Sequence, residues 1–286
     1  MTYVNRRSTR SGTLVPHAGP ALGLRWWGEV DATTSTTVPL ARRRTPLATG
    51  CGEPHDCPPA LRRRVLARTA SFAGLDTDAL ADLDRRMVAL AWRTGEPLHR
   101  AGEPAEHLYV LAAGRVKVVH PTERGTEVIT DVLVPGDLFG TVSTAGDPVH
   151  RETALALTTV CALRMDVAAF RDVLAAHPPV ALQVLDAVAA RLQATRVGAA
   201  RTVSGTVEQR VAGVLLRLAD RLGSDQHAGG TLLQLPLTRA DLAAMTGSTP
   251  ESVSRVMSRL RRAGVVTTGR RWTSVTDAVR LAELAG

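Results

Sequence analysis

The segment from Leu237 to Gly264 constrains the fold more than any other part of the chain, because it contains two short helical patterns separated by a Thr-Gly-Ser turn. Thr249 followed by Pro250 predicts the start of the second helix, since threonine is a good N-cap and proline is tolerated at the first helical position. Gly264 predicts the end of that helix. The pattern indicates a helix-turn-helix, a motif that places its second helix in the major groove of DNA.

The second predicted helix has one apolar face and one polar face. Apolar residues recur along it at spacings of three and four, as a helix packed on one side requires; they are Val253, Val256, Met257 and Leu260. Arginine can donate two hydrogen bonds to guanine and a carboxylate can accept one from cytosine, so Arg255 and Glu251 are candidates for reading neighbouring base pairs. The polar side chains expected to contact DNA are Glu251, Ser254, Arg255 and Ser258.

The residues after Gly264 have the pattern of two short strands around Gly269, which predicts a wing beside the helix-turn-helix. Arg270 and Arg271 are candidates for phosphate contacts from this wing. The alternative is that these polar groups form an ordinary solvated surface. Charge favours DNA binding, because residues 201–286 carry 12 basic and 7 acidic side chains, whereas residues 71–200 carry 12 and 16.

Together, the helix-turn-helix and wing resemble the C-terminal domain of the CRP/FNR family of bacterial transcription regulators. The upstream segments YVLAAGRVKV at 109–118 and VPGDLFG at 134–140 resemble the β-roll of that family's sensor domain. The resemblance covers roughly residues 71–286. It implies an α+β fold with an N-terminal β-roll sensor like a cyclic-nucleotide-binding jelly roll, a long dimerisation helix and a C-terminal winged helix-turn-helix.

Four segments follow from this organisation. They are a disordered extension at 1–58, which is rich in Thr, Arg, Gly and Pro, the roll with its flanking helices at 59–177, the dimerisation helix at 178–203, and the winged helix-turn-helix at 204–286. Ahead of the roll we expect helices from about Ala60 to Thr69 and from Thr77 to Ala91. The strands of the roll are expected between about Trp92 and Leu163.

The expected dimerisation helix carries apolar residues at alternating steps of three and four. This spacing predicts a coiled-coil seam between two copies of the chain, formed by Leu185, Val188, Leu192 and Thr195. A helix face buried within a monomer is the alternative. The resemblance to dimeric regulators supports the seam.

Four roll residues form the candidate effector pocket: Gly140, Thr141, Arg151 and Glu152. In cyclic-nucleotide-binding members of the family, a Gly-Glu pair engages the ribose and an Arg-Ser/Thr-Ala run holds the cyclic phosphate. Here Thr141 follows Gly140, and Glu152 follows Arg151. Both departures disfavour cAMP, because the ribose acceptor is lost and Glu152 is expected to compete for Arg151 and to repel phosphate.

The three cysteines point to a different sensor. Cys51 and Cys57 have the Cys-x5-Cys spacing of FNR-type oxygen sensors, and Cys161 lies on the last part of the roll, so the resemblance implies a candidate iron–sulfur cluster held by all three. The family's further N-terminal cysteine would fall at Ala48, which leaves three thiolates. A redox-active thiol pair, another metal and a structural role are the alternatives. The eight histidines show no pattern that selects haem.

These observations predict a homodimeric transcription regulator that couples a redox, oxygen or nitric oxide signal to a palindromic operator. The Glu-x-x-Ser-Arg pattern ending at Arg255 resembles the FNR type and implies a TTGAT-like half-site. One alternative is a regulator that responds to a small molecule or cyclic nucleotide without metal, and another is an effector-binding module that acts through protein contacts. An activator would also contact RNA polymerase.

An enzyme is not expected, because the sequence contains no nucleophile–base set, Walker loop or complete dinucleotide fingerprint. No stretch approaches the roughly 18 apolar residues of a membrane span. We therefore expect a cytoplasmic protein with double-stranded DNA as its partner.

Overall fold

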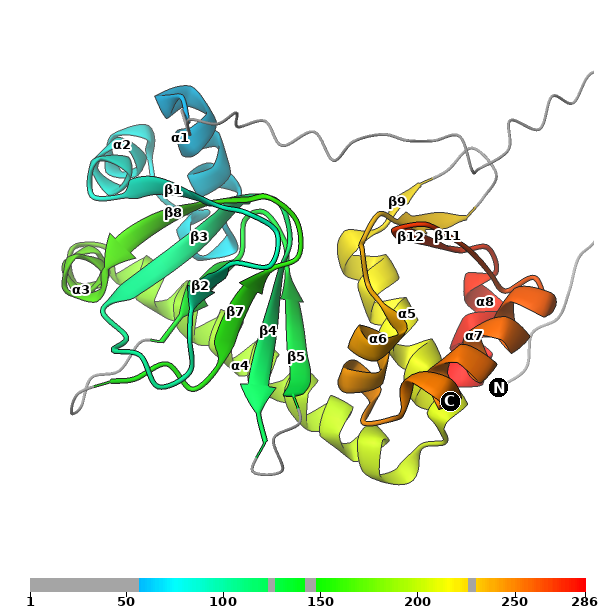
Figure 1. The fold of residues 1–286 in the computed structure, drawn as a ribbon. Coiled ribbons are helices and arrows are strands. Elements are labelled where there is room, and N and C mark those ends of the chain that lie inside the picture. The colour runs from blue at the N-terminus through cyan, green and yellow to red at the C-terminus, as the bar shows by residue number, and fades with distance from the viewer. Residues whose placement is uncertain (1–56, 123–126, 142–147, 226–229) are drawn as a thin grey trace, which may run out of the picture. The chain divides into compact units, whose positions relative to one another are not determined.

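The computed structural model describes residues 57–122, 127–141, 148–225 and 230–286. These residues form N-terminal helices, a β-roll of two four-stranded sheets, a long helix and a helical module with its own small sheet (Figure 1). This mixture confirms the expected α+β fold. Most of the predicted N-terminal extension, 1–56, lies outside the described residues.

Two α-helices and one short 3-10 helix precede the roll among the described residues. Helix α1 spans Pro59–Arg68, the short 3-10 helix η2 spans Ala70–Phe72, and helix α2 spans Thr77–Arg85. The expectation that the second helix continues to Ala91 was wrong. Residues Val88–Trp92 form strand β1, which pairs antiparallel with strand β8, so pairing with a distant segment decides the conformation of an apolar run that also suits a helix.

The roll is built from two sheets that enclose an apolar core. Its strands are β1 (Val88–Trp92), β2 (Pro97–His99), β3 (His107–Ala113), β4 (Val116–Pro121), β5 (Glu127–Leu133), β6 (Leu138–Gly140), β7 (Thr153–Ala156) and β8 (Val160–Asp166). One sheet has the order β1-β8-β3-β6 and the other β2-β7-β4-β5. Side chains from both sheets meet between them, including Tyr109, Val118 and Phe139.

The turn between β3 and β4 depends on Gly114. This residue has φ +89, and a Cβ at this position would lie 2.3 Å from the carbonyl oxygen of Thr159. Only glycine fits so close to the neighbouring backbone, so the turn at Gly114 has a steric requirement.

Two helices follow the roll: α3 spans Val167–Ala176 and α4 spans Pro178–Ser204. Helix α4 matches the helix predicted after Pro178. Helix α3 buries Val167, Phe170 and Val173 in a cluster with residues of α1 and the roll. Among the described residues no single helix is long and apolar enough to cross a membrane, although α3 and the first part of α4, bent by 117°, meet that criterion jointly.

The C-terminal module packs four helices against a small sheet. Its elements are α5 (Val207–Leu222), β9 (Ser224–Asp225), β10 (Thr231–Leu233), α6 (Arg239–Thr246), α7 (Pro250–Arg262), β11 (Val266–Gly269), β12 (Trp272–Val275) and α8 (Ala278–Ala285). The sheet order is β11-β12-β10-β9. Val211, Val253 and Leu281 belong to the module's core, which holds α5, α7 and α8 together.

Candidate DNA interface and effector pocket

Helices α6 and α7 form the helix-turn-helix expected from the sequence. Thr238 and Asp241 form a capping box at the start of α6, and Gly247 ends that helix in the left-handed conformation. The hydroxyl of Thr249 accepts a hydrogen bond from the backbone N–H of Ser252 at 3.3 Å, which caps α7 as predicted. The signals that fix this motif are local, so each could be read directly from the sequence.

Helix α7 presents its predicted polar face to solvent. Its apolar positions Val253, Val256, Met257 and Leu260 are buried, whereas Glu251, Ser254, Arg255 and Ser258 are exposed. The Nη2 group of Arg255 lies 3.2 Å from the hydroxyl of Ser252, one turn earlier. The pKa of Glu251 is lowered by its own backbone N–H, then by the Thr249 hydroxyl and by the nearby charge of Arg255. The face thus offers an ionised carboxylate and a guanidinium near a helix N-terminus, which can bond to base edges.

The wing is a hairpin of β11 and β12. The two short strands expected around Gly269 are present, and because Gly269 pairs with Trp272 the turn itself is formed by Arg270 and Arg271. A Cβ at Gly269 would lie 2.3 Å from the indole of Trp272, which explains the glycine. Arg271 has φ +67, and both arginines are exposed. The hairpin therefore holds two guanidinium groups at its tip, where they can reach phosphates.

The four predicted effector residues lie together in the roll. They line a cavity of about 310 Å³ with five residues that sequence reasoning missed: His99, Val118, His120, Phe139 and Arg191. Arg191 belongs to α4, so the long helix contributes a wall of the pocket. The five missed residues come from β2, β4, β6 and α4, and only the fold brings these elements close to Arg151.

Glu152 has a different partner from the one expected. Its Oε1 atom accepts a hydrogen bond from the hydroxyl of Thr130 at 2.9 Å. No ion pair joins it to Arg151 in the described part of the roll. The pocket therefore contains Arg151 and Arg191 as basic groups beside a carboxylate already held by a neighbouring strand.

Two histidines stack at the side of this cavity. The rings of His99 and His150 are 3.8 Å apart with 19° between their planes, and His150 Nδ1 lies 3.3 Å from the hydroxyl of Thr141. Burial and the neighbouring His150 lower the pKa of His99 from 6.5 to about 4. The pKa of His150 is also lowered, chiefly by burial. The stack is therefore neutral near pH 7.

The cysteines do not form a complete metal site among the described residues. Cys57 and Cys161 are both buried, and Cys51 lies outside the described ranges. No group of three His, Cys, Asp or Glu residues that could hold a metal ion occurs in the part of the chain that the structure describes. These residues alone therefore do not supply the donor set of an iron–sulfur cluster.

The predicted dimer seam is a row of exposed apolar side chains on α4. Leu185, Val188 and Leu192 are 62%, 59% and 50% exposed. Thr195 is also exposed, and its hydroxyl donates to the backbone carbonyl of Arg191 at 2.9 Å. Within the part of the chain that the structure describes, these leucines and valine are therefore not used in the core.

A β-roll followed by a winged helix-turn-helix is the architecture of a class of DNA-binding proteins. Residues 90–177 match the sequence model of the cyclic nucleotide-binding domain, and residues 209–284 match that of the Crp-like helix-turn-helix domain. The chain belongs to the CRP/FNR family of transcription regulators, whose DNA binding is through the helix-turn-helix.

Two curated relatives show the range of the family. The chain is 29% identical over 221 residues to the CRP-like cAMP-activated global transcriptional regulator of Mycobacterium tuberculosis, covering 77% of this chain and 98% of the relative. It is 28% identical over 240 residues to the transcriptional activator protein FnrL of Cereibacter sphaeroides, covering 82% and 92%. The similarity therefore extends to relatives of both the CRP and the FNR type.

A solved structure supports the same assignment. The chain is similar to FixK2 from Bradyrhizobium japonicum with a TM-score of 0.63 and 26% identity, covering 70% of this chain and 98% of FixK2. The shared architecture includes both the sensor roll and the DNA-binding module.

Proposed function

We propose that the protein is a homodimeric regulator that binds a palindromic operator with TTGAT-like half-sites and responds to a small polar molecule in the roll pocket. The observation that carries the proposal is the exposed face of α7, where Glu251, Ser254 and Arg255 lie above a fully buried apolar face. Two copies of this face would read two half-sites. RNA polymerase is a further partner where the operator lies in an activated promoter.

Dimerisation through α4 is supported by the exposed seam. Leu192→Asp would place a carboxylate in the dimer contact, so we expect dimers to give way to monomers and the affinity for palindromic DNA to fall. Val279→Asp is the matched control, because Val279 is an exposed apolar residue of α8, 74% accessible and outside the seam. Sedimentation at micromolar protein measures the result. A Leu192→Asp protein that stays dimeric would contradict the seam.

The choice of a small polar ligand is supported by the contents of the pocket. Arg151, Arg191 and two histidines surround a cavity of about 310 Å³, which suits a small molecule that carries an anionic or hydrogen-bonding group. Thr141 stands where a cyclic-nucleotide site has its carboxylate, so we expect cAMP to leave the melting temperature and operator affinity unchanged. Stabilisation by cAMP that Arg151→Gln removes would contradict this part of the proposal.

An iron–sulfur sensor is the second candidate, and its support is the Cys-x5-Cys spacing of Cys51 and Cys57 together with Cys161 on β8. The described donors do not complete a cluster, so this candidate depends on Cys51. Iron and acid-labile sulfide in anaerobically purified protein, lost together on Cys→Ser substitution at 51, 57 or 161, would favour the cluster. Anaerobically purified protein without iron would contradict the cluster and favour the small-molecule proposal.

A further inference from the structure

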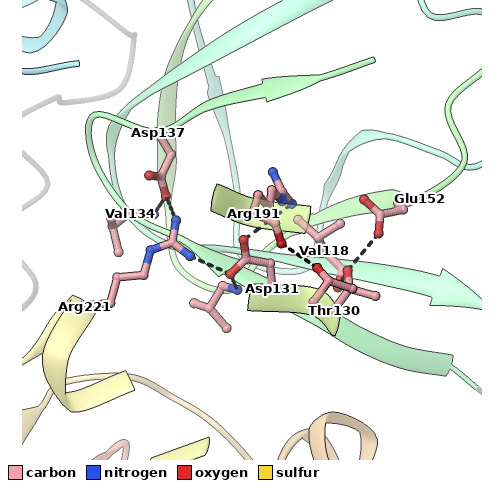
Figure 2. Close-up of polar contacts among 10 residues, drawn as sticks. Val118, Thr130, Asp131, Val134, Asp137, Glu152, Arg191 and Arg221 are labelled. Carbon is pink, nitrogen blue, oxygen red and sulfur yellow. Dashed lines mark hydrogen bonds and ion pairs between the residues drawn. The ribbon is translucent and has the colours of Figure 1, made fainter. Parts of the chain in front are cut away.

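One carboxylate of the roll joins the long helix α4 to the DNA-binding module. Oδ2 of Asp131, on β5, lies 3.4 Å from Nη2 of Arg191 on α4. Oδ1 of the same side chain accepts a hydrogen bond of 2.6 Å from Nη1 of Arg221, in the last turn of α5. Figure 2 shows the two guanidinium groups approaching Asp131 from different helices.

Arg221 is held from two sides. Its Nη2 group donates to Oδ2 of Asp137 at 2.6 Å, so one guanidinium spans two carboxylates (Figure 2). Burial lowers the pKa of Arg221, but Asp131 and Asp137 outweigh this effect and raise it above its usual value. The arginine is therefore charged, and its bonds fix both the distance and the direction of approach.

Backbone N–H groups also hold both carboxylates, independently of Arg221. Oδ1 of Asp131 accepts from the N–H of Val132 at 2.8 Å, and Oδ2 of Asp137 accepts from the N–H of Val134 at 2.7 Å. Each carboxylate thus has little freedom to follow Arg221 if the helix moves. A rigid acceptor pair of this kind resists rotation of α5 as well as separation from the roll.

A third ion pair and an apolar contact lie between the same two parts of the chain. Nζ of Lys117, on β4, donates to Oδ1 of Asp241 on α6 at 2.7 Å. Apolar roll residues Val119, Ile129, Val132 and Leu157 belong to the same core cluster as the DNA-binding module. Apolar burial has no preferred direction, so the charged contacts are the ones that define an orientation.

Helix α5 carries this orientation to the recognition helix. It buries Val211, Ala212, Val214 and Leu215 in the cluster that also holds Val253 and Val256 of α7. A shift of Arg221 would therefore shift α7 with it. Arg191 directly precedes Leu192 of the proposed seam on α4. Asp131 therefore links α5, and with it α7, to the helix that would form the dimer axis.

We infer that the Arg191–Asp131–Arg221 junction, completed by Asp137, is a positioning contact that sets which half-site spacing the dimer accepts. The inference rests on the proposed function, namely dimerisation through α4 and reading of DNA by α7. A two-fold dimer recognises a palindrome only when its two recognition helices match the half-site separation. The junction fixes that separation without touching DNA.

The junction also lies beside the pocket. Arg191 lines the cavity and contacts Asp131, so a pocket ligand that bonds to this guanidinium would compete with the carboxylate. A ligand in the pocket could therefore change the orientation of the DNA-binding module, and with it the operators that the dimer binds.

The test compares binding to palindromes whose half-sites are separated by a series of spacer lengths. For Arg221→Gln we expect the ratio of the affinities for the best and the worst spacer length to fall about fivefold to tenfold, while the affinity for a single half-site stays unchanged. Asp131→Asn combined with Asp137→Asn should give the same profile, and adding Arg221→Gln to that pair should change it no further. Arg221→Lys, which keeps the charge but cannot span both acceptors, should restore part of the selectivity.

Arg280→Gln is the matched control. It removes one arginine charge from the same module, but its partner is Glu283 on the same helix. Hydrogen exchange without DNA provides a second readout, in which Arg221→Gln should speed exchange in β5 and at the end of α5. An unchanged spacer profile with normal half-site binding would overturn this inference alone, whereas absence of half-site binding by the unmodified protein would overturn the proposed function.

Discussion

The polar groups of the recognition helix come from one continuous segment, whereas those of the roll pocket come from several distant segments. In α7, one continuous segment of 13 residues supplies an exposed polar face, and a buried apolar face holds it in place. In the pocket, residues from β2, β4, β6 and α4 meet around a cavity, and one of them, His99, is buried with its ring stacked on His150. Substitutions on the exposed face of α7 should therefore act independently of one another, whereas substitutions in the pocket should also change the stability of the roll.

The largest expected difference is a response of the roll to acid. His99 has a pKa of about 4 in the folded protein and about 6.5 when unfolded, because burial and then His150 disfavour its charged form. Its contribution to stability is therefore complete above pH 6.5 and is lost as the pH falls from 6.5 towards 4. Linkage gives a loss of about 2–3 kcal/mol by pH 4.5.

Urea unfolding at pH 7 and pH 4.5 measures this loss. The comparison uses His99→Gln, which should lose less stability over the interval, and His120→Gln, which changes an exposed histidine of the same pocket. Equal losses in the unmodified protein and in His99→Gln would show that the stacked pair is not the source.

The next largest effect should be on the affinity for the DNA half-site, with no change in the stability of the roll. Arg255→Ala removes a donor that can form two bonds to guanine, so we expect a cost of about 1–3 kcal/mol on the preferred half-site and weaker discrimination at one base pair. Binding to single-base variants of the half-site measures the change, and the unfolding free energy should stay constant. Retained discrimination at every position would assign base reading to another residue.

The smallest expected effect concerns the wing. Arg270→Ala should weaken binding to all sequences similarly and lower the slope of log affinity against log salt by about 1, because one phosphate contact is lost. A salt titration with specific and unrelated DNA measures it. If Arg270→Ala instead changed base preference, the wing would have a reading role and the contrast with α7 would need revision.

Local signals explain which parts of this architecture could be predicted. The caps at Thr249 and Pro250, the apolar spacing in α7 and the glycines of the turns each act within a few residues, so the sequence was enough to locate the helix-turn-helix. The predicted end of the helix that begins at Thr77 was wrong, because the apolar run Val88–Trp92 suits a helix as well as a strand and only its pairing with β8 decides between them.

Most of the candidate pocket and the whole junction depend on distant contacts. Arg221 reaches Asp131 and Asp137 across 90 and 84 positions of the chain, and no local pattern distinguishes it from other arginines in α5. His99 and Arg191 were missed for the same reason, since they join Arg151 only after the strands have paired. The family resemblance supplied Gly140, Thr141, Arg151 and Glu152 because it carries information about a fold that one sequence does not.

The ion pair of Lys117 with Asp241 gives the protein an unusual chemical property. Lys117 is the sole lysine among the 286 residues, so its ε-amine is the one side-chain amine that acylating or alkylating reagents can reach. Reductive methylation with isotopically labelled formaldehyde would therefore place a single side-chain reporter at the contact between roll and α6, in addition to the label on the α-amine. Dimethylation keeps the positive charge and one N–H, so the reporter can retain its bond to Asp241. Its resonance would follow the attachment of the DNA-binding module in the native chain without an engineered probe.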